Sequence, residues 1–270
     1  MFVVVSAVAT LAALFIETES LTAEDRLVVT GSSTVAPILG EIVKRYEALH
    51  HGVRIDVQTG GSARGLHDTR AGLADIGMVS RRLKPREADL TSYTIALDGL
   101  AMIVHAQNPV AELSESRIIG IYTGKIDNWS ELGGADAKTV VVSKAEGRST
   151  LELFLDHFGL TSPEIVADIV IGDNEQAVKT VAGNPYAIGY VSIGAASYQV
   201  AHGVTIRLLP LNGVPATPEM VAAKRFPILR ELNLVVSGEP PRPVADFIAF
   251  ARSPQVRDIL KSFDVVAPGP

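Results

Sequence analysis

Three turns of small residues follow β-type runs in this chain, and each is followed by a helix-like segment. They are residues 31–35 (GSSTV), 59–65 (TGGSARG) and 144–150 (KAEGRST). A helix N-terminus presents unpaired backbone N–H groups and the positive end of the helix dipole, so it attracts anions. Ser and Thr add hydroxyl donors, and Gly lets the backbone approach a ligand. Three such turns, two of them followed by a basic residue, predict a shared site for a small, highly charged anion.

The composition is that of an ordinary globular protein. The chain has 270 residues, of which 47% are hydrophobic and 20% are charged. This length exceeds the usual size of one domain, so we expect two. The net charge of −6 disfavours a broad nucleic-acid surface, and we expect no nucleic-acid partner. A bound anion must therefore be selected by a few local groups.

Several kinds of chemistry lack their usual residues. The chain has no Cys, which excludes disulfides, thiolate metal sites and a Cys nucleophile. Its six His show no metal-ligand spacing, and no GxSxG, GxGxxG or P-loop motif occurs. We therefore expect no metal, no cofactor and no enzymatic activity. A phosphatase that uses Ser149 is the weakest alternative, because no motif supplies a base for that serine.

The chain begins with an apolar segment. Residues 2–15 are almost all hydrophobic, and no charged residue precedes Glu17. The run is too short for a typical membrane span and favours a signal peptide cleaved near Ala23. No Lys or Arg precedes the run, and a buried N-terminal helix is the alternative. We expect residues 1–23 to be removed on export to the periplasm.

Alternating strands and helices are predicted after this segment. Apolar residues recur at helical spacing over 35–49, and residues 53–57 alternate as a strand does. Residues 62–71 read as a short helix and residues 74–79 as a strand. This order predicts an α/β fold with a largely parallel sheet. Ligands in such sheets bind outside the carboxyl ends of the strands, where all three turns fall.

Two long apolar strands are predicted to cross between two lobes. They are residues 99–106 (GLAMIVHA) and 232–236 (LNLVV). We therefore expect residues 24–102 and 229–270 to form lobe I, and residues 103–228 to form lobe II.

Taken together, several segments resemble the phosphate-binding proteins of phosphate ABC transporters. They are residues 27–39, 59–84, 121–134 (IYTGKIDNWSELGG), the EGRST turn and 184–192 (NPYAIGYVS). The resemblance implies a two-lobed, type II periplasmic-binding-protein fold, with mixed, mostly parallel sheets and a ligand cleft between the lobes. It also implies a monomeric, non-catalytic receptor outside the cytoplasm, which binds inorganic phosphate and delivers it to a membrane permease.

The resemblance also implies a set of ligand-binding residues. The first turn would donate from the Thr34 side chain and the Val35 N–H, the second from Ser62, and the third from its cations and hydroxyls. The full set is Ser33, Thr34, Val35, Ser62, Ser80, Arg81, Lys144, Arg148, Ser149 and Thr150.

Three positions depart from the family pattern. Ser80 stands where the family has a carboxylate that accepts the proton of phosphate and repels a fully ionised anion. Lys144 stands where Arg is usual and offers a point charge instead of a planar fork, which Arg148, at a position where Ser is usual, could restore. Glu146 could orient either cation or serve as the missing acceptor. The alternatives are thus a receptor for sulfate, molybdate or a phosphate ester, or a sensor or adhesion protein on the same fold.

Overall fold

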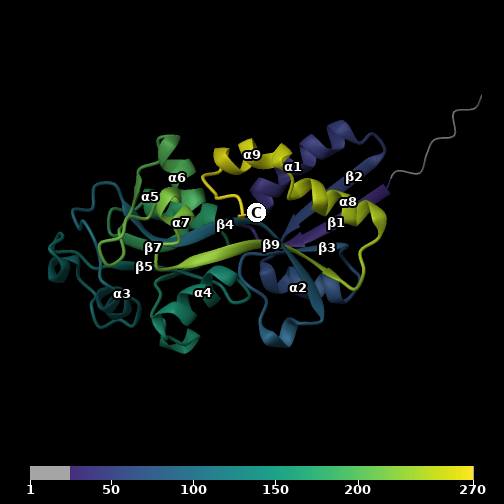
Figure 1. Cartoon of the computed structure of the whole chain (residues 1–270). Helices are drawn as coiled ribbons and strands as arrows, with labels where there is room; N and C mark the ends of the chain where they lie inside the picture. Colours follow the sequence, from purple (N-terminus) through teal and green to yellow (C-terminus); the bar gives the residue numbers. More distant parts are fainter. Residues whose placement is uncertain (1–24, 270) are drawn as a thin grey trace, which may run out of the picture.

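The computed structural model describes residues 25–269 and shows a mixed α/β protein (Figure 1). The predicted signal peptide, residues 1–23, lies outside the described residues. The strands are β1 (Asp25–Gly31), β2 (Val53–Thr59), β3 (Ile76–Val79), β4 (Leu90–His105), β5 (Val140–Lys144), β6 (Ile169–Ile171), β7 (Ala187–Ser192), β8 (Ile206–Leu208) and β9 (Leu229–Ser237). The helices are α1 (Ala36–Leu49), α2 (Ser62–Arg70), α3 (Glu115–Tyr122), α4 (Ser149–Phe158), α5 (Asn174–Ala182), α6 (Ile193–Ala201), α7 (Pro218–Ala222), α8 (Arg242–Ala251) and α9 (Arg257–Ser262).

The strands follow the order β2-β1-β3-β9-β4-β7-β5-β6, with β8 paired to β4. At the two ends of this order the pairing is parallel: β1 lies between β2 and β3, and β5 lies between β6 and β7. In the middle, β4 and β9 run antiparallel to each other and to the strands beside them. Both long strands pass through the centre of the molecule in Figure 1. The sheet is therefore mixed, with its parallel parts at the two ends.

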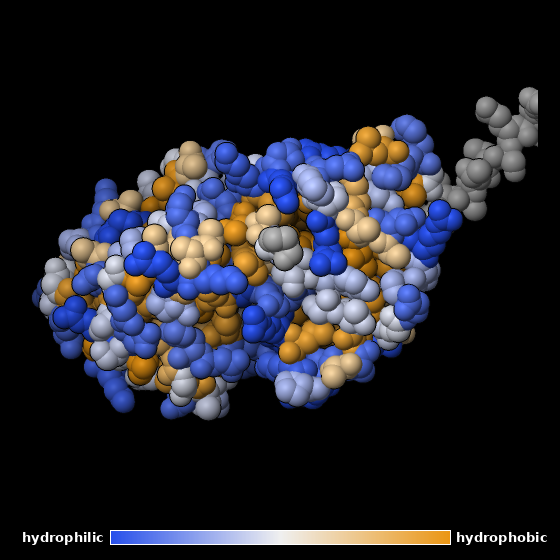
Figure 2. Space-filling view, viewed as in Figure 1, coloured by the Kyte–Doolittle hydropathy of each residue, from blue (hydrophilic) through white to orange (hydrophobic). Residues whose placement is uncertain are grey.

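Two main hydrophobic cores lie along this sheet. The first contains β1, α1, β3, α8 and α9, with Leu39 and Phe247 among its fully buried side chains. The second contains α3, α4 and β7, with Tyr122 and Trp129 among its fully buried side chains. Strand β4 contributes residues to both cores, and the buried residues of the second core lie between Leu100 and Ile228. Figure 2 shows that hydrophilic residues cover much of both ends, with hydrophobic residues visible between them.

The sequence explains how the helices begin. Pro37 lies in the first turn of α1, where a missing N–H costs no intrahelical hydrogen bond. Gly61 precedes α2 with a φ of 92°, a conformation that glycine adopts without strain. Asp173 caps α5 by accepting from the Gln176 N–H, in the capping-box pattern. Within residues 25–269, no helix is long and apolar enough to cross a membrane.

Candidate anion-binding site

A small cavity lies where four βα turns meet. Its lining comprises residues 32–34, 61–62, 148–150 and 172–174, together with Ser80 and Lys144. Each of the four turns leads into a helix, namely α1, α2, α4 and α5. The unpaired N–H groups and the partial positive charges of four helix N-termini therefore surround one cavity, and this favours a bound anion.

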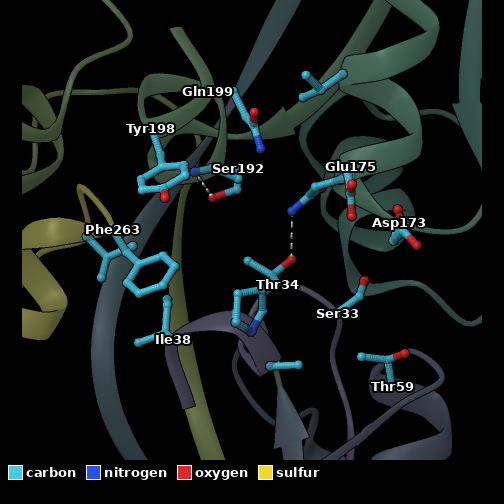
Figure 3. Close-up of a pocket in the computed structure, with 16 residues that line it drawn as sticks. Ser33, Thr34, Ile38, Thr59, Asp173, Glu175, Ser192, Tyr198, Gln199 and Phe263 are labelled. Atoms are coloured by element: carbon cyan, nitrogen blue, oxygen red, sulfur yellow. Dashed lines mark hydrogen bonds between the residues drawn. The ribbon is translucent and has the colours of Figure 1, made fainter. Parts of the chain in front are cut away.

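The hydroxyl groups of the cavity are arranged as donors. Thr34 Oγ1 accepts a hydrogen bond from Asn174 Nδ2 over 3.2 Å (Figure 3). Ser62 Oγ likewise accepts from the Ser80 N–H, over 3.2 Å. Neither hydroxyl donates to an acceptor among the described residues, so its O–H hydrogen remains available for a ligand.

The third turn adds two more hydroxyls. Thr150 Oγ1 accepts from Arg230 Nη1 over 3.1 Å. Ser149 Oγ is buried and has no hydrogen-bond partner among the described residues. A buried hydroxyl without a partner costs free energy, and a ligand in the cavity would supply the missing partner.

Three cationic side chains lie in or beside the cavity. Arg230 is neutralised by Asp98, with 2.7 Å between Nη2 and Oδ2, and both side chains are at most 1% exposed. Lys144 is only 4% exposed and donates from Nζ to the Asp173 carbonyl oxygen over 2.6 Å. Burial lowers the pKa of Lys144 to about 7; the Asp173 charge opposes this shift, whereas Arg230 and Arg148 add to it.

Arg148 is a cation without a counter-ion in the described part of the chain. It precedes the first turn of α4, where its charge opposes the helix dipole. Two glycines make room for it: a Cβ at Gly61 would lie 3.0 Å from Arg148 Cδ, and one at Gly172 would lie 3.1 Å from Nη2. A guanidinium held over glycines at a cavity edge is suited to bind a tetrahedral oxyanion through paired donors.

Most of the ligand-binding residues predicted from the sequence lie around the cavity. Eight of the ten line it: Ser33, Thr34, Ser62, Ser80, Lys144, Arg148, Ser149 and Thr150. Val35 does not, because its side chain is buried in the first core and its N–H donates to the Ser32 carbonyl oxygen over 3.2 Å. Glu146 is exposed and accepts a hydrogen bond from Ser162, so it is outside the lining.

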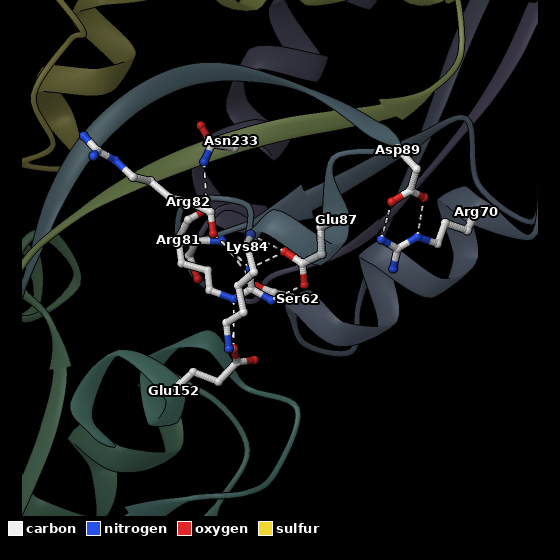
Figure 4. A network of polar contacts seen from close by, with 10 residues as sticks. Ser62, Arg70, Arg81, Arg82, Lys84, Glu87, Asp89, Glu152 and Asn233 are labelled. Atoms are coloured by element: carbon white, nitrogen blue, oxygen red, sulfur yellow. Dashed lines mark hydrogen bonds and ion pairs between the residues drawn. The ribbon is translucent and has the colours of Figure 1, made fainter. Parts of the chain in front are cut away.

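Arg81 also lies outside the cavity lining. Its guanidinium forms two hydrogen bonds with the Glu87 carboxylate, at 2.7 and 2.9 Å. Its Nε lies 3.0 Å from Glu152 Oε2, and Lys84 Nζ lies 2.6 Å from the same oxygen (Figure 4). Both carboxylates engage Arg81, so its guanidinium belongs to a polar network beside the cavity and not to the cavity lining.

Sequence reasoning missed a fourth turn. Asp173 and Asn174 line the cavity, and they connect β6 to α5. The signal was present in residues 169–176 (IVIGDNEQ), where a short apolar run is followed by Gly172 and a capping box. The strand has only three residues, so its β-type pattern is weaker than that of the other three.

Contacts across the cavity join its two sides. Beside the Thr34–Asn174 hydrogen bond, the Ala63 N–H donates to the Gly147 carbonyl oxygen over 3.3 Å. A pocket of about 480 Å³ adjoins the cavity; Thr34 and Asn174 line both, while Tyr198 and Phe263 line only the pocket (Figure 3). The turns of α1 and α2 thus touch those of α4 and α5.

Among residues 25–269, no group of His, Asp and Glu is arranged to hold a metal ion.

Known proteins resemble this chain over most of its length. The PBP superfamily domain matches residues 17–255. The phosphate-binding protein PstS of Bacillus subtilis is 29% identical over 244 residues, covering 89% of this chain and 78% of that protein. PstS of Borreliella burgdorferi is 27% identical over 241 residues, covering 86% of each chain.

Solved structures show the same relationship. A substrate-binding protein attributed to phosphate ABC transport in Clostridium perfringens, with bound phosphate, has a TM-score of 0.85 and 32% identity, covering 91% of this chain and all of that one. A phosphate transport receptor of Vibrio cholerae has a TM-score of 0.73 and 29% identity, covering 90% of this chain and 100% of that one. The chain therefore belongs to the PBP superfamily and, within it, to the family of phosphate-binding proteins of phosphate ABC transporters.

Proposed function

We propose that this protein binds inorganic phosphate in the cavity and delivers it to an ABC transporter permease. The observation that carries the proposal is the meeting of four helix N-termini with Arg148, a cation that has no counter-ion in residues 25–269. A dianion would satisfy the helix ends, the free hydroxyl hydrogens and this guanidinium together. The C. perfringens relative, which has bound phosphate, supports the same ligand.

We infer binding without catalysis. No histidine lines the cavity in the described part of the chain, and its one carboxylate, Asp173, caps α5. Each charge-assisted hydrogen bond is worth roughly 1.5–3 kcal/mol, so several together exceed what binding requires. The surplus offsets the dehydration of the anion and drives closure of the two sides.

The two main cores support two lobes that close on the ligand, with Leu100, Ala101 and Met102 of the first lobe also packed into the second core. In this proposal lobe I comprises residues 24–102 and 229–270, and lobe II comprises residues 103–228. Strands β4 and β9 connect them, and the contacts across the cavity hold them together. Export through a signal peptide at residues 1–23, a periplasmic location and a monomeric state complete the proposal.

Sulfate, or another fully ionised oxyanion, is the second candidate ligand. Ser80 lines the cavity at the position where the family has a carboxylate. Without that negative charge, the cavity lacks one repulsion that would exclude sulfate. Selectivity for phosphate must then arise from another group.

Titration calorimetry with phosphate, sulfate, molybdate and phenyl phosphate tests these proposals. We expect phosphate to bind with a stoichiometry of about one. Thr34→Val removes one donor while keeping the side-chain shape, and it should weaken binding several-fold. Thr91→Val, at an exposed position of β4, is the matched control and should bind phosphate as the wild type does. Absence of phosphate binding by the wild type would refute the proposed function.

A further inference from the structure

Lys144 is a buried amine that faces the cavity without an ion-pair partner. It ends β5, and its backbone N–H donates to the Tyr190 hydroxyl over 3.2 Å. Its Nζ donates to the Asp173 carbonyl oxygen, which is neutral, and no carboxylate lies within ion-pair distance of it among the described residues. Burying an ammonium in this way is costly unless a ligand brings negative charge.

Burial favours the uncharged amine of Lys144 over its ammonium, because it removes the group from water. Arg148 and Arg230 both lower the pKa of Lys144, and the Asp173 carboxylate, which accepts from the Gln176 N–H, raises it. Burial raises the pKa of Tyr190 to about 12, so its hydroxyl stays neutral. Arginine keeps its proton at any ordinary pH. Lys144 is therefore the cation at this cavity whose charge can change near neutrality.

We propose, building on the phosphate-binding function above, that Lys144 determines which protonation states of an oxyanion the cavity accepts. As an uncharged amine, its lone pair accepts the hydrogen bond of the O–H group of hydrogen phosphate. As an ammonium, it donates to an oxygen of a fully ionised anion such as sulfate. One side chain thus supplies an acceptor at a site where Ser80 replaces a carboxylate.

The two ligands then differ in proton balance. At pH 8 the free protein holds Lys144 mostly as the amine, and free phosphate is mostly hydrogen phosphate. Their complex forms with no net proton exchange, because the ligand brings the proton of the hydrogen bond. Sulfate brings no proton, so its complex takes up about one proton from solution to form the ammonium.

This difference can be measured by calorimetry in two buffers with different enthalpies of ionisation. At pH 8, sulfate binding should take up close to one proton more than phosphate binding. Between pH 6 and pH 8, sulfate affinity should fall about tenfold, given the pKa of about 7 for Lys144. Phosphate affinity should not fall over the same range.

Lys144→Arg is the decisive variant, because arginine donates but does not lose its proton. The difference in proton uptake between the two anions should disappear, and the preference should shift from phosphate toward sulfate. Asp173→Asn tests the one carboxylate that lines the cavity as an alternative acceptor, and asparagine still caps a helix. The difference in proton uptake should persist in this variant. Lys138→Arg, at an exposed site, controls for the substitution itself.

Several results would overturn the role of Lys144. Equal proton uptake with both anions would show that Lys144 simply becomes charged whenever an anion binds. Failure of sulfate to bind at pH 6, where the ammonium is present, would also contradict the role of Lys144. The same holds if the difference in proton uptake disappears in Asp173→Asn but remains in Lys144→Arg. If one of these results is obtained and the wild type still binds phosphate, the proposed function stands while the inference fails. If the wild type does not bind phosphate, both fail.

Discussion

Glu152 Oε2 lies 3.0 Å from Arg81 Nε, which joins the first turn of α4 to the segment after β3. Glu152 is three residues past Ser149, and Arg81 directly follows Ser80, so both partners adjoin residues that line the cavity. An ion pair therefore connects the two sides of the cavity outside its lining, in addition to the hydrogen bonds described above (Figure 4). In the proposed closure of the two lobes, this ion pair is well placed to stabilise the closed state.

Glu152→Gln should weaken phosphate binding by roughly threefold to tenfold, because it weakens the ion pairs with Arg81 and Lys84 that span the two sides. The loss of a negative charge near the cavity would by itself strengthen phosphate binding, because it removes a long-range repulsion of the anion. Glu175→Gln, in the first turn of α5, is the matched control for that charge effect, since Glu175 pairs with Lys179 of its own helix. If both variants bind phosphate equally well in calorimetry, the ion pair does not contribute to closure.

Arg148→Ala should weaken phosphate binding by roughly 2–4 kcal/mol, the scale for losing a charged donor in a desolvated site. Stability without ligand should be unchanged or slightly higher, because a cation at a helix N-terminus opposes the dipole. Calorimetry and thermal unfolding of the phosphate-free protein measure the two effects. Unchanged affinity would show that the guanidinium points to solvent.

Gly61→Ala should weaken phosphate binding by more than about tenfold. A Cβ there would lie 2.8 Å from the Gly147 carbonyl oxygen, on the opposite side of the cavity, and would hold the two sides apart. Gly72→Ala is the control: its φ is also positive, at 67°, but no heavy atom lies within 4 Å of the added carbon. Gly72→Ala should lose about 1–2 kcal/mol of stability through backbone strain. Gly61→Ala should lose more, because its φ of 92° and ψ of 160° lie in a region that only glycine adopts, and only Gly61→Ala should lose affinity.

Lys144→Met should stabilise the phosphate-free protein most at pH 7 and below. The pKa of Lys144 is lowered from 10.5 to about 7 in the folded state. Between these values the unfolded chain binds a proton that the folded protein lacks, so the stability of the wild type rises with pH. The advantage of Lys144→Met should therefore shrink from pH 7 toward pH 10, by at most about 1.4 kcal/mol per pH unit.

Urea unfolding at pH 6, 7, 8 and 9 measures this trend. Lys138→Met is the control, because Lys138 is exposed and its pKa is raised by Asp168, so it stays charged in both states over this range. Its effect on stability should not vary with pH. A pH-independent effect of Lys144→Met would show that the amine is not desolvated.

The βα turns could be predicted from the sequence because each combines local signals. Gly31 and Gly61 permit positive φ, and the small residues after them precede clear helical periodicity. The strand predicted at residues 99–106 extends in the structure from Leu90, because its first half pairs with β9 through long-range contacts. Pairing with a strand that is distant in the sequence produces no hydrophobic periodicity within the segment itself, so the first half of β4 could not be predicted.

The partners of individual side chains could not be predicted from the sequence. Lys144 ends β5 and Arg81 closely follows β3, yet Arg81 pairs with Glu87 and Glu152 while Lys144 lines the cavity. The difference depends on which carboxylates the fold brings near each cation. Asp173 was overlooked because its turn follows a strand of three residues.

A crystal structure of the protein with phosphate tests the central claim most directly. We predict phosphate in the cavity, within hydrogen-bond distance of the Thr34, Ser62 and Ser149 hydroxyls and of the Arg148 guanidinium. Phosphate bound elsewhere, or an empty cavity with Arg148 turned to solvent at saturating phosphate, would contradict the account.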